Sequence, residues 1–316
     1  GPTWITTVFV NGTEVGQWKY GYTSFWFDIT DALHEGQNEV LVRCNLRHPN
    51  SRWYSGAGLY RNVELWEAPD LHLMPDGLYV AAKEGDNGAW TVAVTAEAGS
   101  VTAASTGRTL TLHLTDDNGS LLGTAAIPTD AWAALPSPDG WRTGKETAIY
   151  KASHTFTLQN PALWDLDAPS FYHITAELTG ADGVTDTLTT RFGCRTIEAT
   201  PDCGLLVNHK RVLIKGVCIH HDFGCLGSAF EYSAAKRQLE ILKSMGVNSI
   251  RTGHTPPAPQ FMDLADEMGI LMDVESFDCW RSGKNPYDYG RFFDEWQEKD
   301  VAAWIRRDRN HPSLLF

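Results

Sequence analysis

The stretch SIRTGHTPPAPQFMDLADEMGILMDVES (residues 249–276) carries the patterns of a strand, a helix and a second strand. Four apolar residues in its middle recur at the i, i+3, i+4, i+7 spacing of a helix face: Phe261, Leu264, Ala265 and Met268. Gly269 follows them as a typical helix end, and apolar runs flank the helix on both sides. Strands joined by a helical crossover run parallel, so this stretch predicts one unit of a parallel sheet.

The same alternation continues on both sides of this unit. An apolar run, VLIKGVCIHH (212–221), precedes a predicted helix that Ser233 would cap and Gly246 would end. A longer helix then precedes the apolar run SLLF (313–316). Strands alternating with helices, without the GxGxxG turn of a dinucleotide-binding sheet, predict the first half of a (β/α)8 barrel over residues 201–316.

The part of the chain before the barrel consists of short β-rich runs between turn residues. Asn11-Gly12 is a strong hairpin signal, and FWFDIT (25–30) has the length and composition of a strand. We therefore predict an antiparallel sandwich over residues 1–68 and a second sandwich, of immunoglobulin-like size, over residues 69–200.

Composition restricts the classes of partner. Acidic residues outnumber basic ones, 39 to 26, which gives a net charge of −13. Nucleic acids and anionic membranes attract positive surfaces, so neither is an expected partner, and a neutral ligand fits the balance better. The 12 tryptophans supply flat apolar faces that fill cores or stack on sugars. The six cysteines form no CxxC pair, and we expect them to be mostly free and buried.

Polar residues follow each predicted barrel strand, at the ends where barrel enzymes carry their active sites. They are His220, His221 and Asp222 after the first strand, Arg251 and His254 after the second, and Asp273, Glu275 and Asp278 around the third. Adjacent histidines on a strand point to opposite faces, which disfavours a shared metal ion. Asp273 and Glu275 share a face, whereas the two carboxyls of a glycosidase flank the sugar, so structural or supporting roles are favoured.

Five stretches together resemble glycoside hydrolase family 2, and most of all its bacterial β-galactosidases. They are SRWYSGAGLYRNVEL (51–65), NPALWDLDAPSFYHITAEL (160–178), KGVCIHHDFGCLG (215–227), SIRTGHTPPAPQFMDLADEMGILMDVESFDCW (249–280) and RDRNHPSLLF (307–316). The resemblance implies a jelly-roll sugar-binding domain over residues 1–68, an immunoglobulin-like domain over 69–200 and the first half of a catalytic TIM barrel over 201–316. The order agrees with the one predicted from the patterns.

The resemblance also implies roles for individual residues. His220 and His254 would surround the bound sugar, and Asp222 would contact its hydroxyl groups. Asn50, beside the RWY segment, is the nearest match to a residue that the first domain lends to the sugar in some members. Arg251 would be a buried support for the catalytic carboxylates, and Glu275 is expected to have a supporting role as well.

In the family, the RNHPS segment and a short strand lead to an Asn-Glu pair whose Glu is the acid/base, and the nucleophilic Glu follows later. The resemblance therefore places both carboxylates beyond Phe316 and implies an N-terminal portion that is inactive by itself. Some members bind Mg²⁺ through a Glu and a His after the third strand, where this sequence has Cys279 and Arg281. Neither residue suits a hard cation, so no metal or other cofactor is expected.

The activity that the resemblance implies for the intact protein is retaining hydrolysis of terminal β-D-galactosides through a glycosyl-enzyme intermediate. β-Glucuronidase and β-mannosidase are alternatives within the family, although IHHDFGCLG (219–227) favours a galactosidase over the His-Glu-Asp pattern of glucuronidases. A non-catalytic carbohydrate-binding protein is the alternative from another class. The expected partners are β-galactoside sugars. Assembly as a homo-oligomer and the bacterial compartment, cytoplasm or periplasm, are left open by the sequence.

Overall fold

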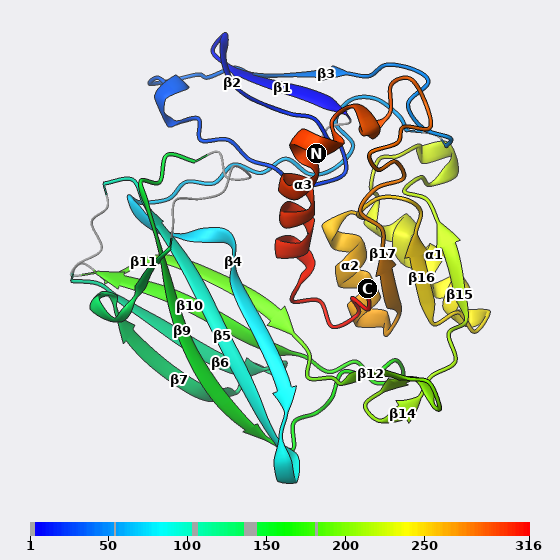
Figure 1. Ribbon diagram of the computed structural model, residues 1–316. Coiled ribbons are helices and arrows are strands. Elements are labelled where there is room, and N and C mark those ends of the chain that lie inside the picture. The colour runs from blue at the N-terminus through cyan, green and yellow to red at the C-terminus, as the bar shows by residue number, and fades with distance from the viewer. Residues whose placement is uncertain (1–3, 54, 103–106, 136–143, 181–182) are drawn as a thin grey trace.

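The computed structural model describes residues 4–53, 55–102, 107–135, 144–180 and 183–316. The chain forms a small N-terminal sheet, a β-sandwich and a parallel sheet with helices (Figure 1). The long helix α3 (Phe293–Asp308) runs down the centre, in contact with the N-terminal part at its start and with the sandwich at its end. The predicted architecture, two β-rich parts followed by part of a TIM barrel, is confirmed.

The N-terminal sheet contains three antiparallel strands in the order β2-β1-β3. They are β1 (Ile5–Val10), β2 (Thr13–Trp18) and β3 (Val40–Asn45). Asn11 and Gly12 have φ of 50° and 82°, the left-handed backbone that a two-residue hairpin turn requires, so the predicted hairpin is confirmed. The prediction of a strand over residues 25–30 is wrong, because the structure has no strand there. Phe25 turns inward instead and stacks on Trp18, with the ring centroids 5.5 Å apart.

The sandwich consists of two four-stranded antiparallel sheets, in the orders β4-β5-β9-β8 and β11-β10-β6-β7. Its strands are β4 (Leu71–Glu84), β5 (Ala89–Ser100), β6 (Thr109–Asp116), β7 (Leu121–Pro128), β8 (Ala133–Leu135), β9 (Ala148–Gln159), β10 (Tyr172–Gly180) and β11 (Gly183–Phe192). Alternate residues point into one shared core, and Val92 of one sheet belongs to the same buried cluster as Leu112 and Ile174 of the other. The alternation of short β-rich runs therefore predicted this sandwich correctly.

A small antiparallel sheet leads into the parallel part of the chain. Its strands are β12 (Ile197–Thr200), β13 (Gly204–Val207) and β14 (Lys210–Arg211). The parallel part contains β15 (Gly216–Ile219), α1 (Tyr232–Ser244), β16 (Ser249–Thr252), α2 (Pro259–Met268) and β17 (Leu271–Val274). β15, β16 and β17 pair in parallel in that order, and apolar side chains of α1 and α2 share a core with the sheet. Short 3-10 helices lie at Thr30–Ala32, Asp86–Gly88, Thr129–Ala131, Gly224–Leu226 and Tyr289–Arg291.

Two details of the parallel part differ from the prediction. β15 begins at Gly216, so the apolar residues before it form an exposed loop in which Leu213 is 70% exposed. α1 begins at Tyr232, so Ser233 lies inside the helix rather than at its cap. The Ser233 hydroxyl donates to a carboxylate oxygen of Glu231, 2.9 Å away, and not to the helix backbone.

The last residues of the chain extend the parallel sheet. The backbone N–H of Met272 donates to the carbonyl of Ser313, and the N–H of Leu315 donates to the carbonyl of Met272, both at 2.8 Å. Leu314 forms a parallel bridge with Met272 between these two bonds. The apolar run at residues 313–316 therefore lies beside β17 as the next parallel segment, which agrees with the predicted half-barrel.

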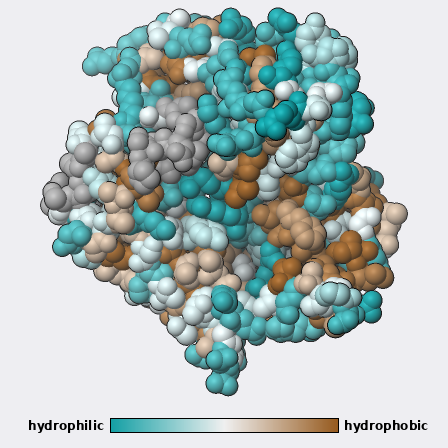
Figure 2. Space-filling model, viewed as in Figure 1, coloured by the Kyte–Doolittle hydropathy of each residue, from teal (hydrophilic) through white to brown (hydrophobic). Residues whose placement is uncertain are grey.

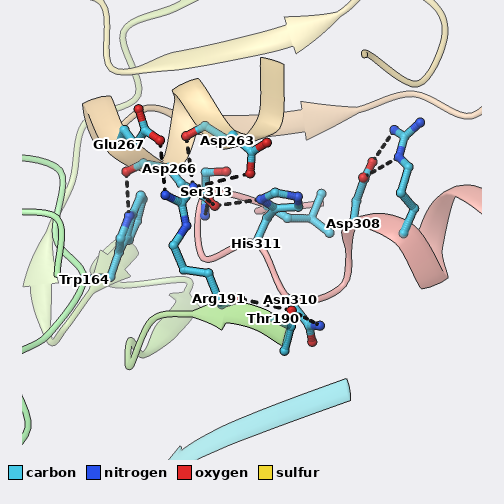
Figure 3. A network of polar contacts seen from close by, with 12 residues as sticks. Trp164, Thr190, Arg191, Asp263, Asp266, Glu267, Asp308, Asn310, His311 and Ser313 are labelled. Atoms are coloured by element: carbon cyan, nitrogen blue, oxygen red, sulfur yellow. Dashed lines mark hydrogen bonds and ion pairs between the residues drawn. The ribbon is translucent and has the colours of Figure 1, made fainter. Parts of the chain in front are cut away.

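A buried polar network holds this last segment against α2 and the sandwich (Figure 3). Asp266 of α2 is 1% exposed, and its carboxylate lies 2.6 Å from Nδ1 of His311 and 3.0 Å from the backbone N of Ser313. Arg191 of β11 reaches the same carboxylate at 3.4 Å. Each charge in the network has a partner of opposite sign, which is the condition for burying it.

No helix among the described residues is long and apolar enough to cross a membrane. Polar residues cover much of the face in Figure 2, while apolar residues gather toward the parallel sheet.

All six cysteines are free, as predicted, but only Cys194 and Cys279 are buried. The expected burial is wrong for the others, because several of them lie on turns or on the edge strand β15.

Candidate functional site

The carboxyl ends of three parallel strands bring three of the predicted site residues together. His220 follows β15, His254 follows β16 and Glu275 follows β17. The rings of His220 and His254 lie edge to face, with centroids 5.6 Å apart. Nδ1 of His254 lies 2.5 Å from Oε2 of Glu275. These imidazole and carboxylate groups thus form one polar cluster, as expected where parallel strands end at the same edge of a sheet.

Arg251 joins this cluster from the middle of β16. One of its guanidinium nitrogens donates to Oε1 of Glu275, and another donates to Sγ of Cys218, 3.1 Å away. Burial opposes the charge of Arg251, but the contacts with Cys218 and Glu275 outweigh it and raise the pKa of the guanidinium. Arg251 is 41% exposed, so the expected burial is absent, although the predicted contact with a carboxylate is present. Both oxygens of Glu275 are occupied by cationic or imidazole groups.

A tryptophan from the N-terminal part completes the cluster. The indole of Trp53 stacks on the ring of His220, with centroids 5.3 Å apart and planes at 24°. The same indole lies 5.5 Å from the ring of His254. Sequence reasoning missed Trp53, although the residue stands in the SRWY stretch that carries the family resemblance. An aromatic face beside two imidazoles suits a sugar, whose C–H face and hydroxyl groups need both kinds of contact.

A cavity of about 540 Å³ opens beside this cluster. Its walls include Arg52, His254, Glu275, Asp278, Trp280 and Lys284. Asp278 accepts hydrogen bonds from Arg52 at 2.6 Å and from Lys284 at 2.8 Å. Arg52 and Lys284 were also missed, because a surface cation has no periodic pattern that marks its partner.

The structure places the remaining predicted residues apart from the cavity. Asn50 is 2% exposed, and its side chain donates to the carbonyl of Arg47 and accepts from Ser55, so it is held inside its own loop. Asp222 is partly buried after the end of β15. Among the residues that the structure describes, the cavity walls include neither Asn50 nor Asp222. His220 is also absent from the walls, but its ring lies against that of His254, which lines the cavity. Sugar binding by Asn50 and Asp222 stays a prediction.

His221 lies on the opposite side of the strand end from the cluster. Its ring packs against those of Tyr22 and Tyr60, with centroids 5.1 and 5.9 Å away. Burial and the nearby charge of Arg61 lower the pKa of His221 to about 3, so the ring is neutral. His220 and His221 thus face different surroundings, as strand geometry requires.

The residues at the expected magnesium position have other partners. The thiol of Cys279 donates to Asp288, 3.1 Å away, and Nε of Arg281 donates to Asp294 at 2.7 Å. Asp263, Asp266 and His311 form a second group whose metal-ligating atoms lie close together. Arg191 pairs with both of these carboxylates, and His311 pairs with Asp266, so the network is satisfied without a metal (Figure 3).

Two family profiles match most of the chain. The profile "Glycosyl hydrolases family 2" matches residues 76–195, and "Glycosyl hydrolases family 2, TIM barrel domain" matches residues 199–316. The chain belongs to glycosyl hydrolase family 2. The barrel match of this family covers the strands that carry His220, His254 and Glu275.

Relatives within family 2 differ in the substrates that their names give. Beta-galactosidase BoGH2A of Bacteroides ovatus is 38% identical over 98% of this chain and 35% of its own length. A putative beta-glucuronidase of Formosa agariphila is 33% identical over 98% of this chain and 28% of its own length. The crystal structure of a family 2 member from Bacteroides cellulosilyticus superposes with a TM-score of 0.89 at 30% identity, over 100% of this chain and 39% of that chain. This chain thus spans about a third of the length of these relatives.

Proposed function

We propose that this chain forms part of the active site of a retaining glycosidase that hydrolyses terminal β-D-galactosides. The observation that carries the proposal is the cluster of Trp53, His220 and His254 beside a cavity of about 540 Å³, a volume typical of small-molecule sites. The family supports glycoside hydrolysis. The 38% identity to a protein named beta-galactosidase supports galactose as the sugar.

In this proposal, His220 and His254 hydrogen bond to hydroxyl groups of the sugar, and Trp53 packs beside them. Arg251 and Glu275 form an ion pair that positions His254 through its Nδ1 contact. Asp222 and Asn50 keep the predicted role of further hydroxyl ligands. These contacts use hydrogen-bonding groups and charges of this chain alone, and the proposal includes no metal ion or other cofactor.

Retaining hydrolysis needs two carboxyl groups on opposite sides of the scissile bond, one to donate a proton and one to attack the sugar. Within the described part of the chain, two carboxylates line the cavity, Glu275 and Asp278. Glu275 is paired with Arg251 and His254, and Asp278 with Arg52 and Lys284. These contacts reduce the nucleophilicity of both carboxylates. Two cations also keep Asp278 charged, and both oxygens of Glu275 are occupied, so we assign the attacking and the donating role to residues outside this chain.

A β-glucuronidase is the second candidate. It is favoured by the Formosa agariphila relative, which is 33% identical and is named a putative beta-glucuronidase. The two candidates differ in the group at C6 of the sugar, which is a hydroxymethyl group in galactose and a carboxylate in glucuronic acid.

The test is an assay of the full-length protein on 4-nitrophenyl β-galactoside, β-glucuronide and β-mannoside. We expect kcat/KM for the galactoside to exceed the other two by at least about tenfold, and NMR to show the β-anomer of the sugar as the first product. Faster turnover of the glucuronide would select the second candidate. No turnover of any substrate, with sugar binding retained, would indicate a carbohydrate-binding protein. The His254→Ala variant, purified in the same way, controls for contaminating glycosidases.

A further inference from the structure

The charge of the cavity is opposite to that of the chain. Four cations and two carboxylates line it: Arg52, Arg251, Arg281 and Lys284, with Glu275 and Asp278. The whole chain, in contrast, has 39 acidic and 26 basic residues. Cations gathered around one cavity of an acidic protein create a local potential that attracts anions.

Two of these cations share a single carboxylate. Arg52 and Lys284 both contact Oδ1 of Asp278, at 2.6 and 2.8 Å. Arg251, in contrast, is neutralised by Glu275. Burial favours the neutral acid, but these contacts outweigh it and lower the pKa of Asp278, so the carboxylate stays charged. The two cations nevertheless exceed it by one positive charge.

Arg281 adds a further cation, and its present partner is a weak one. Its Nε donates to Asp294 at 2.7 Å, and the two side chains are 76% and 71% exposed. Exposed ion pairs of this kind contribute little free energy, so a ligand can replace one at small cost. The planar guanidinium matches the two oxygens of a carboxylate or a sulfate, which allows paired hydrogen bonds to either group.

Aromatic side chains line the same cavity. Phe277 is buried, and Trp280 is 59% exposed and lies edge to face against it, with ring centroids 5.8 Å apart. An exposed indole offers an apolar face to a sugar ring. This wall suits a charged saccharide better than a small inorganic anion, which would leave the indole without a contact.

We propose that the preferred substrate is an acidic galactoside, whose terminal sugar carries a carboxylate or a sulfate group. Arg52, Arg281 and Lys284 bind the anionic group, and Trp280 packs against the saccharide. The inference rests on the proposed function, because the galactosyl unit itself is placed at His220 and His254. The inference adds that the substrate is negatively charged, which the net charge of −13 of the whole chain does not indicate.

Binding to the full-length protein, measured by calorimetry, tests the inference independently of turnover. The probes are galactose, galactose 6-sulfate and galacturonate, each at about 0.02 M and about 0.5 M NaCl. We expect at least one acidic sugar to bind about tenfold more tightly than galactose at low salt, and this advantage to shrink at high salt. The comparison between the two acidic sugars identifies the anionic group. Acidic sugars that bind no better than galactose, or do not bind, would overturn the inference.

Charge variants test which residues are responsible. The double variant Arg281→Gln/Lys284→Gln should reduce the advantage of the acidic sugar at least about fivefold. Lys236→Gln/Arg237→Gln is the matched control, because it removes two exposed cations from α1, outside the cavity walls, and it should leave the advantage within about twofold. An equal loss in both variants would contradict the assignment.

The two proposals fail in different ways. Turnover of a neutral chromogenic β-galactoside, without tighter binding of acidic sugars, would reject the acidic substrate and keep the proposed function. Tight binding of an acidic sugar that depends on Arg281 and Lys284, without turnover of any β-galactoside, would keep the anion site and reject the galactosidase.

Discussion

Trp53 stacks on His220, with the ring centroids 5.3 Å apart. Trp53 follows the N-terminal sheet, whereas His220 follows β15, so the contact joins two parts that are far apart in the sequence. The indole also lies 5.5 Å from His254, which gives both imidazoles the same aromatic neighbour. The N-terminal part therefore helps to fix the two side chains that the proposed site uses for sugar hydroxyl groups.

Replacing Trp53 tests this positioning role. In the full-length protein we expect Trp53→Ala to lower kcat/KM on the proposed galactoside substrate by about tenfold or more, because both imidazoles lose the ring that limits their rotation. Trp53→Phe keeps an aromatic face and should recover most of the loss. The measurement is steady-state kinetics together with the thermal midpoint. If Trp53→Ala and Trp53→Phe had the same kcat/KM and differed only in the thermal midpoint, the role of Trp53 would be purely structural.

His254 is expected to act more strongly in the transition state than in the ground state. The hydrogen bond from a fixed donor to a sugar hydroxyl strengthens as the ring distorts. His254→Ala should therefore lower kcat/KM by an amount that corresponds to a loss of about 2 to 4 kcal/mol of transition-state stabilisation. His34→Ala, which alters an exposed histidine in the N-terminal part, is the control and should leave the kinetics unchanged. Unaltered kinetics in the His254 variant would contradict the proposed role.

The sequence predicted the shared edge of His220, His254 and Glu275 because the spacing of apolar runs locates strand ends, and parallel strands end together. It did not predict the contact of Trp53 with these residues, because contacts between separate parts of the chain depend on the path of loops that have no periodic pattern. The prediction of a strand at residues 25–30 was wrong for a related reason. An apolar run that folds inward from a loop has the same composition as a strand.

Asp266 offers a test of the interface between the sandwich and the barrel part (Figure 3). Its side chain is 1% exposed and pairs with Arg191 and His311, so Asp266→Ala removes the carboxylate that His311 contacts and one of the three carboxylates that surround Arg191. We expect a loss of about 3 to 5 kcal/mol in the free energy of unfolding, measured by chemical denaturation. Asp263→Ala is the matched control, since Asp263 pairs with the same arginine but is 50% exposed, and it should cost less than about 1 kcal/mol. Equal losses would show that burial is not the cause.

Ionisation of the Asp300 carboxyl makes the free energy of unfolding depend on pH. Burial raises the pKa of this carboxyl from 3.8 to about 7, although hydrogen bonds from Tyr289, Thr23 and Trp18 partly offset the effect. The folded state thus keeps a proton that the unfolded chain loses between these two values, so this group makes folding less stable as the pH rises through that window. Asp300→Asn cannot ionise, and its free energy of unfolding should decline less than that of the original protein between about pH 4 and pH 7. Parallel pH profiles for the two proteins would contradict the raised pKa.

The 316-residue chain by itself should not hydrolyse β-galactosides. Departure of the leaving group needs a proton donor, and the glycosyl-enzyme intermediate needs a nucleophile on the opposite face of the sugar. Glu275 and Asp278, the carboxylates that line the cavity, are each paired with two groups: Glu275 with Arg251 and His254, and Asp278 with Arg52 and Lys284. A purified chain should therefore bind galactose weakly without turnover, which calorimetry and a chromogenic assay beside the full-length protein can measure. Turnover within about a hundredfold of the full-length rate would show that a carboxylate of this chain does act on the sugar.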